Sequence, residues 1–119
     1  MSEMKLGAVE SRFADIIWQN EPLASSLLAK LAQQELTWKK STTYTVLKRL
    51  CERGIFQNVN GTVSALMSRE EFYALQSERF VEETFDGSLP AFLAAFGSRK
   101  KLSEGEINEL EKLIEKMRG

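Results

Sequence analysis

The chain has 119 residues, of which 43% are hydrophobic and 28% are charged, and its formal net charge is −1. This balance excludes a disordered chain and predicts one globular domain, or one small domain with a helical extension. No apolar run approaches the roughly 20 residues of a membrane span, and no signal peptide opens the sequence. We therefore expect a cytoplasmic protein that makes no membrane contact.

The sequence contains no histidine and a single cysteine, Cys51. This excludes an intrachain disulfide, and neither a Cys/His zinc site nor a His-dependent triad can be built from one chain. The glutamate pairs Glu70–Glu71 and Glu82–Glu83 are weak candidates for catalysis, since adjacent side chains diverge on a helix. We predict that the protein is not an enzyme and needs no cofactor or metal.

Charge is unevenly distributed along the chain. Residues 1–67 carry 8 Lys or Arg and 6 Asp or Glu, whereas residues 68–119 carry 8 and 11. Residues 38–54 contain five cations and only one acid, Glu52. Such a local excess attracts phosphates over about a Debye length, roughly 8–10 Å. A solvated helix face is the alternative interpretation.

Two helices are predicted before the basic segment. Apolar residues at helical spacing over about residues 6–20 indicate the first helix, which Pro22 ends. About residues 24–35 form the second, with Ser25 or Ser26 as its N-cap. Its buried stripe is predicted to be Leu27, Leu28 and Leu31.

The third predicted helix runs from Lys40 or Ser41 to Arg53, and Gly54 follows as a left-handed C-cap. A helical wheel gathers one buried face, which consists of Thr43, Val46, Leu47, Leu50 and Cys51. The other side presents hydroxyls and cations, the groups that hydrogen-bond phosphates and base edges.

A β-hairpin is predicted directly after this helix. Residues 55–59 alternate like a strand, residues 62–67 return, and Asn60-Gly61 is the dipeptide favoured in a two-residue type I′ turn. This order is typical of a winged helix-turn-helix, so we predict a mainly α fold with a small hairpin wing and a DNA-binding domain over residues 1–67. The predicted DNA contacts are Lys39, Lys40, Ser41, Thr42, Tyr44, Thr45, Lys48, Arg49, Arg53 and Asn60.

Residues 68–119 are predicted to be helical. Capping boxes begin at Ser68 and Ser103, and Ser88 can cap a short helix between them, with Pro90 in its first turn. The first of these helices is expected to end near residues 86–87, and residues 97–101 are expected to form a basic connector. The last helix carries an apolar stripe spaced 3, 4, 3, namely Ile107, Leu110, Ile114 and Met117.

This stripe predicts a helical dimerisation domain over residues 68–119. A helix of about fifteen residues is marginal alone, and burying one large apolar side chain stabilises by about 1.5–3 kcal/mol. The alternative is that the tail folds back on its own first domain. A two-fold dimer would match a pseudo-palindromic operator. The predicted dimerisation residues are Phe72, Phe85, Leu89, Phe92, Leu93, Phe96, Ile107, Leu110 and Ile114.

Several motifs together carry a family resemblance over about residues 6–118. They are Ile16-Ile17-Trp18, the pattern Trp38-x-x-x-Thr42-x-x-Thr45-x-x-x-Arg49-Leu50-x-x-x-Gly54, the hairpin, and the later Ser68-x-x-Glu71, Gly87, Ala95-Phe96 and Leu102-Ser103-x-x-Glu106-Ile107-x-x-Leu110. The sequence resembles the BlaI/MecI-type penicillinase-repressor family, which includes copper-responsive repressors.

The resemblance implies a homodimeric winged-helix repressor that controls β-lactam resistance or related genes and is inactivated when a regulatory protease cuts its tail. The family's Asn–Phe scissile bond corresponds in position to Ala95–Phe96, where the first residue differs. The wing also departs from the family, because residues 55–67 contain no Lys or Arg. The cysteine cluster of copper sensors is absent. A winged-helix protein-interaction module without tight DNA binding is therefore the alternative hypothesis.

Overall fold

A computed structural model describes residues 6–119 of the protein. The chain forms two compact units, which we call the head and the tail, and the division falls between Arg79 and Phe80. The sequence placed this boundary between residues 67 and 68, so the head extends further than expected. The first five residues of the predicted head lie outside the described part of the chain.

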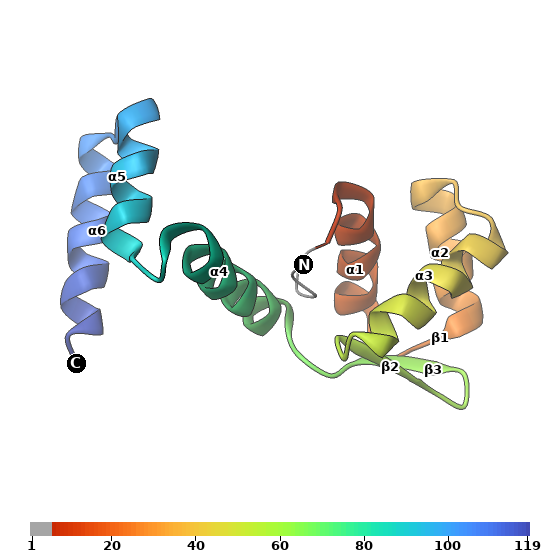
Figure 1. Ribbon diagram of the computed structural model, residues 1–119. Helices are drawn as coiled ribbons and strands as arrows, with labels where there is room; N and C mark the ends of the chain where they lie inside the picture. Colours follow the sequence, from red (N-terminus) through yellow and green to blue (C-terminus); the bar gives the residue numbers. More distant parts are fainter. Residues whose placement is uncertain (1–5) are drawn as a thin grey trace. The chain divides into compact units, whose positions relative to one another are not determined.

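The described part of the head contains three complete helices, a small sheet and the beginning of a fourth helix (Figure 1). The complete helices are α1 (Ala8–Asn20), α2 (Ser25–Leu36) and α3 (Lys40–Glu52). All three predicted helices are thus confirmed. Neither Ser25 nor Ser26 caps α2, because the N-cap residue is Ala24 and no side chain accepts a hydrogen bond there.

The wing is the hairpin of β2 (Phe56–Val59) and β3 (Thr62–Ala65), which pair in antiparallel register. Asn60 and Gly61 join them with φ angles of 52° and 82°, as the predicted type I′ turn requires. A two-residue strand, β1 (Leu23–Ala24), was not predicted; it pairs with β3 and makes the sheet order β1-β3-β2. The wing is therefore attached to the start of α2.

One hydrophobic core holds the head together. Its fully buried side chains include Phe13 and Ile17 from α1, Leu28 from α2, and Leu50 from α3. The predicted stripe of α2 is corrected at Leu27, which is 47% exposed. Small or later residues fill that face instead: Ala29, Ala32 and Leu36.

The fourth helix, α4 (Arg69–Phe85), begins on the head. The Trp18 indole N–H donates to the carbonyl of Met67 at 3.1 Å, and the Trp18 ring packs against Phe72 and Tyr73. Arg69 pairs with Asp15 of α1 at 2.8 Å. These contacts fix the first turns of α4 to α1, which explains why the head does not end at residue 67.

The tail contains the end of α4, α5 (Leu89–Arg99) and α6 (Glu104–Met117). The predicted caps are confirmed, since the hydroxyls of Ser68, Ser88 and Ser103 each accept a backbone N–H at the start of a helix. The expected connector over residues 97–101 is corrected, because α5 continues to Arg99. No helix within residues 6–119 is long and apolar enough to cross a membrane.

Candidate DNA-binding interface

The outward face of α3 is a strip of hydroxyl and cationic side chains. Thr42, Thr45, Lys48 and Arg49 are exposed, and Ser41 lies beside them at the helix start. The opposite face is buried at four of the five positions that the helical wheel predicted: Thr43, Val46, Leu47 and Leu50. The fifth, Cys51, is only half-buried. Burial of one side of α3 therefore fixes which side chains this helix can present to a ligand.

Internal hydrogen bonds limit what two of these hydroxyls can do. The Thr45 hydroxyl donates to the carbonyl of Ser41 at 2.9 Å, so its remaining capacity is to accept a hydrogen bond and to offer its methyl group. Tyr44 is half-buried, and its hydroxyl lies 3.5 Å from Ser25 of α2. The acceptor and methyl group of Thr45 suit contacts to base edges, where acceptors and apolar groups discriminate between bases, whereas the Tyr44 hydroxyl is directed towards α2.

Cations surround the beginning of α3. Lys39 is the N-cap residue, Lys40 is the first helical residue, and both are exposed. The first turn of α3 contains no acidic residue. The positive end of the helix dipole and the two ammonium groups therefore act in the same direction and attract anions such as phosphate. The remaining predicted cation, Arg53, is half-buried at the C-terminal end.

The wing lies alongside α3. A hollow of about 280 Å³ is lined by Tyr44, Leu47, Lys48 and Cys51 of α3 and by Asn58 of β2. Burial, and then the charge of Glu52, raise the pKa of the Cys51 thiol, which disfavours the reactive thiolate. Asn58 thus joins the polar surface of α3, while Asn60 is exposed at the turn of the wing.

Sequence reasoning missed Glu10, which contacts this surface through Arg49. Arg49 donates from Nη1 to Oε2 of Glu10 at 3.0 Å, which joins the last turns of α3 to the first turn of α1. The two residues are 39 positions apart. Nothing in the local pattern of residues 6–20 pairs Glu10 with the third helix, so this contact required the tertiary structure.

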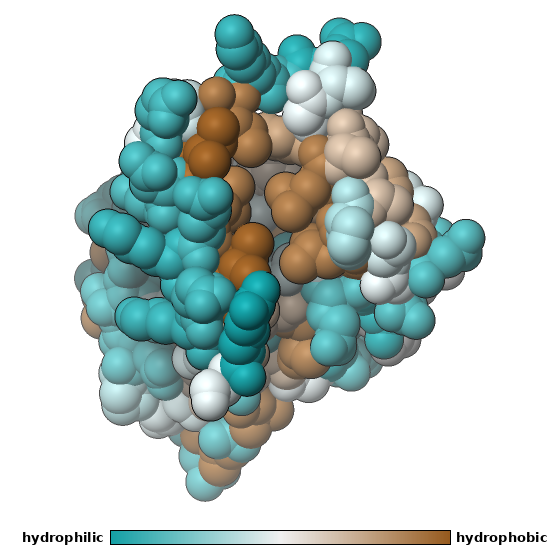
Figure 2. Space-filling model, turned by 90° about the vertical axis from the view of Figure 1, so that its left-hand side faces the viewer, coloured by the Kyte–Doolittle hydropathy of each residue, from teal (hydrophilic) through white to brown (hydrophobic). Residues whose placement is uncertain are grey.

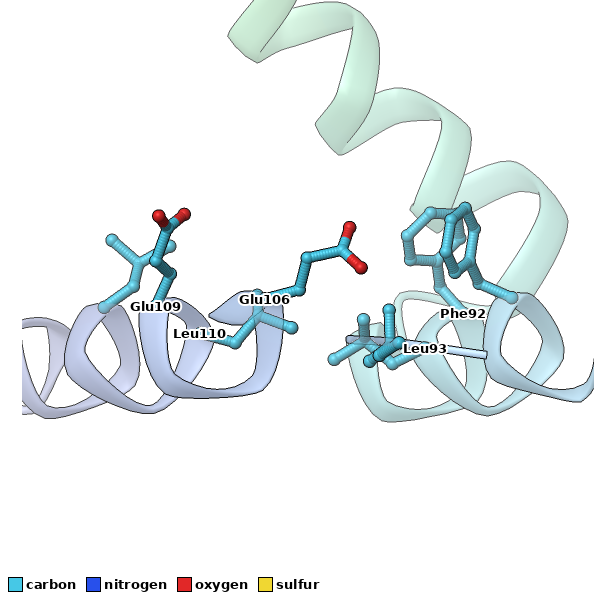
Figure 3. A pocket seen from close by; sticks show the side chains of 8 residues that line it. Phe92, Leu93, Glu106, Glu109 and Leu110 are labelled. Atoms are coloured by element: carbon cyan, nitrogen blue, oxygen red, sulfur yellow. The ribbon is translucent and has the colours of Figure 1, made fainter. Parts of the chain in front are cut away.

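The tail carries a second surface, which is apolar. Every residue from 80 to 119 is exposed or half-buried, and both α5 and α6 lack a buried residue. Figure 2 shows hydrophobic side chains gathered in a hollow on the face of the tail. The hollow measures about 500 Å³ (Figure 3), and its lining is Phe92, Leu93, Phe96, Leu102, Glu106, Glu109, Leu110 and Leu113.

Eight of the nine predicted dimerisation residues belong to the tail. Phe92, Leu93, Phe96 and Leu110 line the hollow. Phe85 packs its ring against Phe92 at a centroid distance of 5.7 Å. Further apolar side chains are exposed outside the lining: Leu89 at 49%, Ile107 at 39% and Ile114 at 49%.

The structure corrects the prediction that Phe72 is a dimerisation residue. Its side chain is 0% exposed and belongs to the head core, where it lies against Trp18 and Tyr73. A ring that one chain has already buried has no surface left for a partner. Its position near the start of α4 misled the sequence reasoning, which assigned the whole of that helix to the tail.

The residues of the predicted cleavage site lie within a helix. Ala95 and Phe96 are both in α5, and the Ala95 carbonyl accepts a hydrogen bond from the Ser98 hydroxyl at 2.8 Å. A protease must bind an extended peptide, so cutting this bond requires α5 to unwind locally. Both side chains are exposed in the described chain.

A three-helix head, a hairpin wing and an outward polar and cationic face on the third helix define a winged-helix DNA-binding protein. A profile of the penicillinase repressor family matches residues 6–116. The chain therefore belongs to the penicillinase repressor family, whose members are DNA-binding transcriptional repressors.

Individual relatives are similar over almost their whole length but at low identity. The chain is 24% identical over 115 residues to the penicillinase repressor of Bacillus licheniformis, covering 93% of this chain and 90% of the relative. It is 21% identical over 116 residues to the methicillin resistance regulatory protein MecI of Staphylococcus aureus, covering 94% of each. The MecI protein of Mammaliicoccus sciuri is 20% identical with the same coverage.

Proposed function

We propose that the protein acts as a homodimer that represses transcription by binding a pseudo-palindromic operator through α3. The observation that carries the proposal is the exposed strip on α3 that contains Thr42, Thr45 and Lys48, of which Lys48 lines the hollow beside the wing. The hydroxyls would read base edges in the major groove, while the lysines would hold phosphates.

The tail supports the homodimer. No residue of the tail is fully buried, so a partner that covers its apolar side chains would add the burial that is the main favourable term in folding. A second copy of the same hollow would cover Phe92, Phe96 and Leu110 in both chains at once, since a two-fold interface uses the same patch twice. The two heads would then be presented to two half-sites of one operator.

The family suggests which genes the protein controls. Relatives bear the names penicillinase repressor and methicillin resistance regulatory protein, so we propose control of β-lactam resistance or related genes. A regulatory protease that cuts the tail at Ala95–Phe96 is part of the same proposal. Cleavage there would divide α5 and remove α6 from the surface that joins the two chains.

Binding to the DNA upstream of the protein's own gene tests the proposal. Fluorescence anisotropy would compare wild type with Lys48→Ala and Thr42→Ala. We expect Lys48→Ala to weaken binding to every duplex, because it removes a phosphate contact, and Thr42→Ala to weaken binding to the upstream DNA selectively. Lys112→Ala is the matched control, since Lys112 is an exposed cation of α6.

Two results would contradict the proposal. Equal effects of Lys48→Ala and Lys112→Ala would show that α3 is not the binding surface. No binding to any duplex at low salt would favour the alternative of a protein-interaction module, which the uncharged wing suggests.

A further inference from the structure

The ion pair between Glu10 and Arg49 places an acid directly beside the DNA-binding surface. Its Nη1–Oε2 distance is 3.0 Å, and the Glu10 side chain is 20% exposed while that of Arg49 is 49% exposed. The other carboxylate oxygen, Oε1, accepts the backbone N–H of Gly7 at 3.2 Å. Both oxygens of Glu10 are therefore engaged, and the carboxylate is held in place at the start of α1.

The scaffold behind Glu10 is rigid. Phe13 and Ile17, which follow it on α1, are fully buried in the head core. The backbone of α3 at Arg49 is fixed in the same way, because the neighbouring Leu50 is 0% exposed. The ion pair thus joins two helices held by the core, and it favours one orientation of the Arg49 guanidinium before DNA binds.

Arg49 lies on the side of α3 that carries Thr42 and Thr45, at spacings of seven and four residues. A guanidinium has five N–H donors in a planar fork, and the bond to Glu10 uses Nη1. The Nε and Nη2 edge can still form the bidentate contact to guanine O6 and N7. Reading a base is therefore compatible with keeping the ion pair.

Contact with a phosphate is different. A phosphate brings negative charge towards the carboxylate of Glu10, which repels it within a Debye length. If Arg49 turns its whole guanidinium to a phosphate, its ion pair with Glu10 breaks. The phosphate contact must then compensate for the loss of that ion pair. Non-operator DNA is bound almost entirely through phosphates, so it is penalised more than an operator.

We propose that Glu10 is a specificity-determining residue that restrains Arg49 for base reading and weakens binding to non-operator DNA. This inference rests on the proposed function, in which the face of α3 binds DNA. Exposed ion pairs are modest in strength, which sets the expected effect at about two- to fivefold in affinity for each subunit.

Glu10→Gln tests the proposal, because the glutamine amide oxygen can still accept the Gly7 N–H. Anisotropy titrations would use the upstream DNA and a scrambled duplex of equal length, with the full-length protein. We expect Glu10→Gln to tighten binding to the scrambled duplex about two- to fivefold per subunit and to change upstream binding by less. The discrimination between the two duplexes therefore falls.

Two further variants show whether the effect passes through Arg49. In an Arg49→Ala background, Glu10→Gln should lose most of its effect on the scrambled duplex. Asp15→Asn is the matched control: it removes the same charge from the same helix but faces Arg69, so it should leave the discrimination unchanged. Melting temperatures of all variants would verify that they fold.

The outcomes separate this inference from the proposed function. If Arg49→Ala weakens upstream binding while Glu10→Gln changes neither duplex, or changes both equally, the role of Glu10 is refuted and the DNA-binding face stands. If Glu10→Gln acts equally with and without Arg49, the role is also refuted. If Arg49→Ala changes neither duplex, Arg49 is no DNA contact and both assignments of this residue fail.

Discussion

Truncation of Phe96 should weaken the homodimer. Its side chain is 44% exposed in the single chain and lines the apolar hollow of the tail. Full burial of a large apolar side chain stabilises by about 1.5–3 kcal/mol, so burying the exposed part contributes about 0.7–1.3 kcal/mol. The proposed two-fold interface would contain this side chain twice. Phe96→Ala should therefore cost about 1.3–2.6 kcal/mol and raise the dimer Kd about 10- to 80-fold.

Sedimentation equilibrium over a concentration series measures this Kd directly. Leu66→Ala is the control, because Leu66 is also exposed, at 54%, but lies on the head. Phe96→Leu should lose less than Phe96→Ala, since it keeps most of the apolar surface. A wild-type protein that stays monomeric at micromolar concentration would refute the reasoning. An unchanged Kd in Phe96→Ala would remove the hollow from the interface.

Further predictions concern the core, the turns and the pH response. Phe56→Ala should lower the free energy of unfolding of the head by about 3–5 kcal/mol in urea titrations, because its ring is 0% exposed; exposed Val59→Ala should change it little. Gly61→Ala should destabilise the head by about 1–2 kcal/mol because φ is 82°, whereas Gly97→Ala, within α5, should stabilise the tail by about 0.5–1 kcal/mol. The backbone N–H of Ser103, and then its hydroxyl, lower the pKa of Glu106 below its ordinary 4.5, so the helical signal in circular dichroism should decrease as the pH falls below that value. Ser103→Ala should weaken that pH response; an equal response in both proteins would contradict the cap.

Proton linkage determines how the stability of α6 depends on pH. A carboxyl group whose folded-state pKa is lowered stabilises the folded state when the pH is above its unfolded value. That stability disappears as the pH falls through the folded-state pKa. The contribution of Glu106 is therefore present at neutral pH and lost only in acid.

Local patterns predicted most of the secondary structure. Ser68, Ser88 and Ser103 mark helix starts because a side-chain cap acts within one turn, and Asn60-Gly61 marks the hairpin because its backbone angles depend on two adjacent residues. Such signals need no knowledge of the rest of the chain.

Features that depend on distant contacts could not be predicted in this way. Phe72 and Phe92 both read as apolar residues of the second half, yet Phe72 is buried in the head by Trp18, 54 residues earlier in the chain. The Glu10–Arg49 pair and the strand β1 likewise depend on how α1, α3 and the wing pack together. Helical periodicity shows which face is apolar but not which partner covers it.

The salt dependence of binding to the protein's own upstream DNA tests the central claim most directly. Four cation–phosphate contacts in each subunit of a dimer predict a slope of roughly −7 when the logarithm of the binding constant is plotted against that of the salt concentration. A slope near zero, or no binding at low salt, would contradict a dimer that holds DNA through α3.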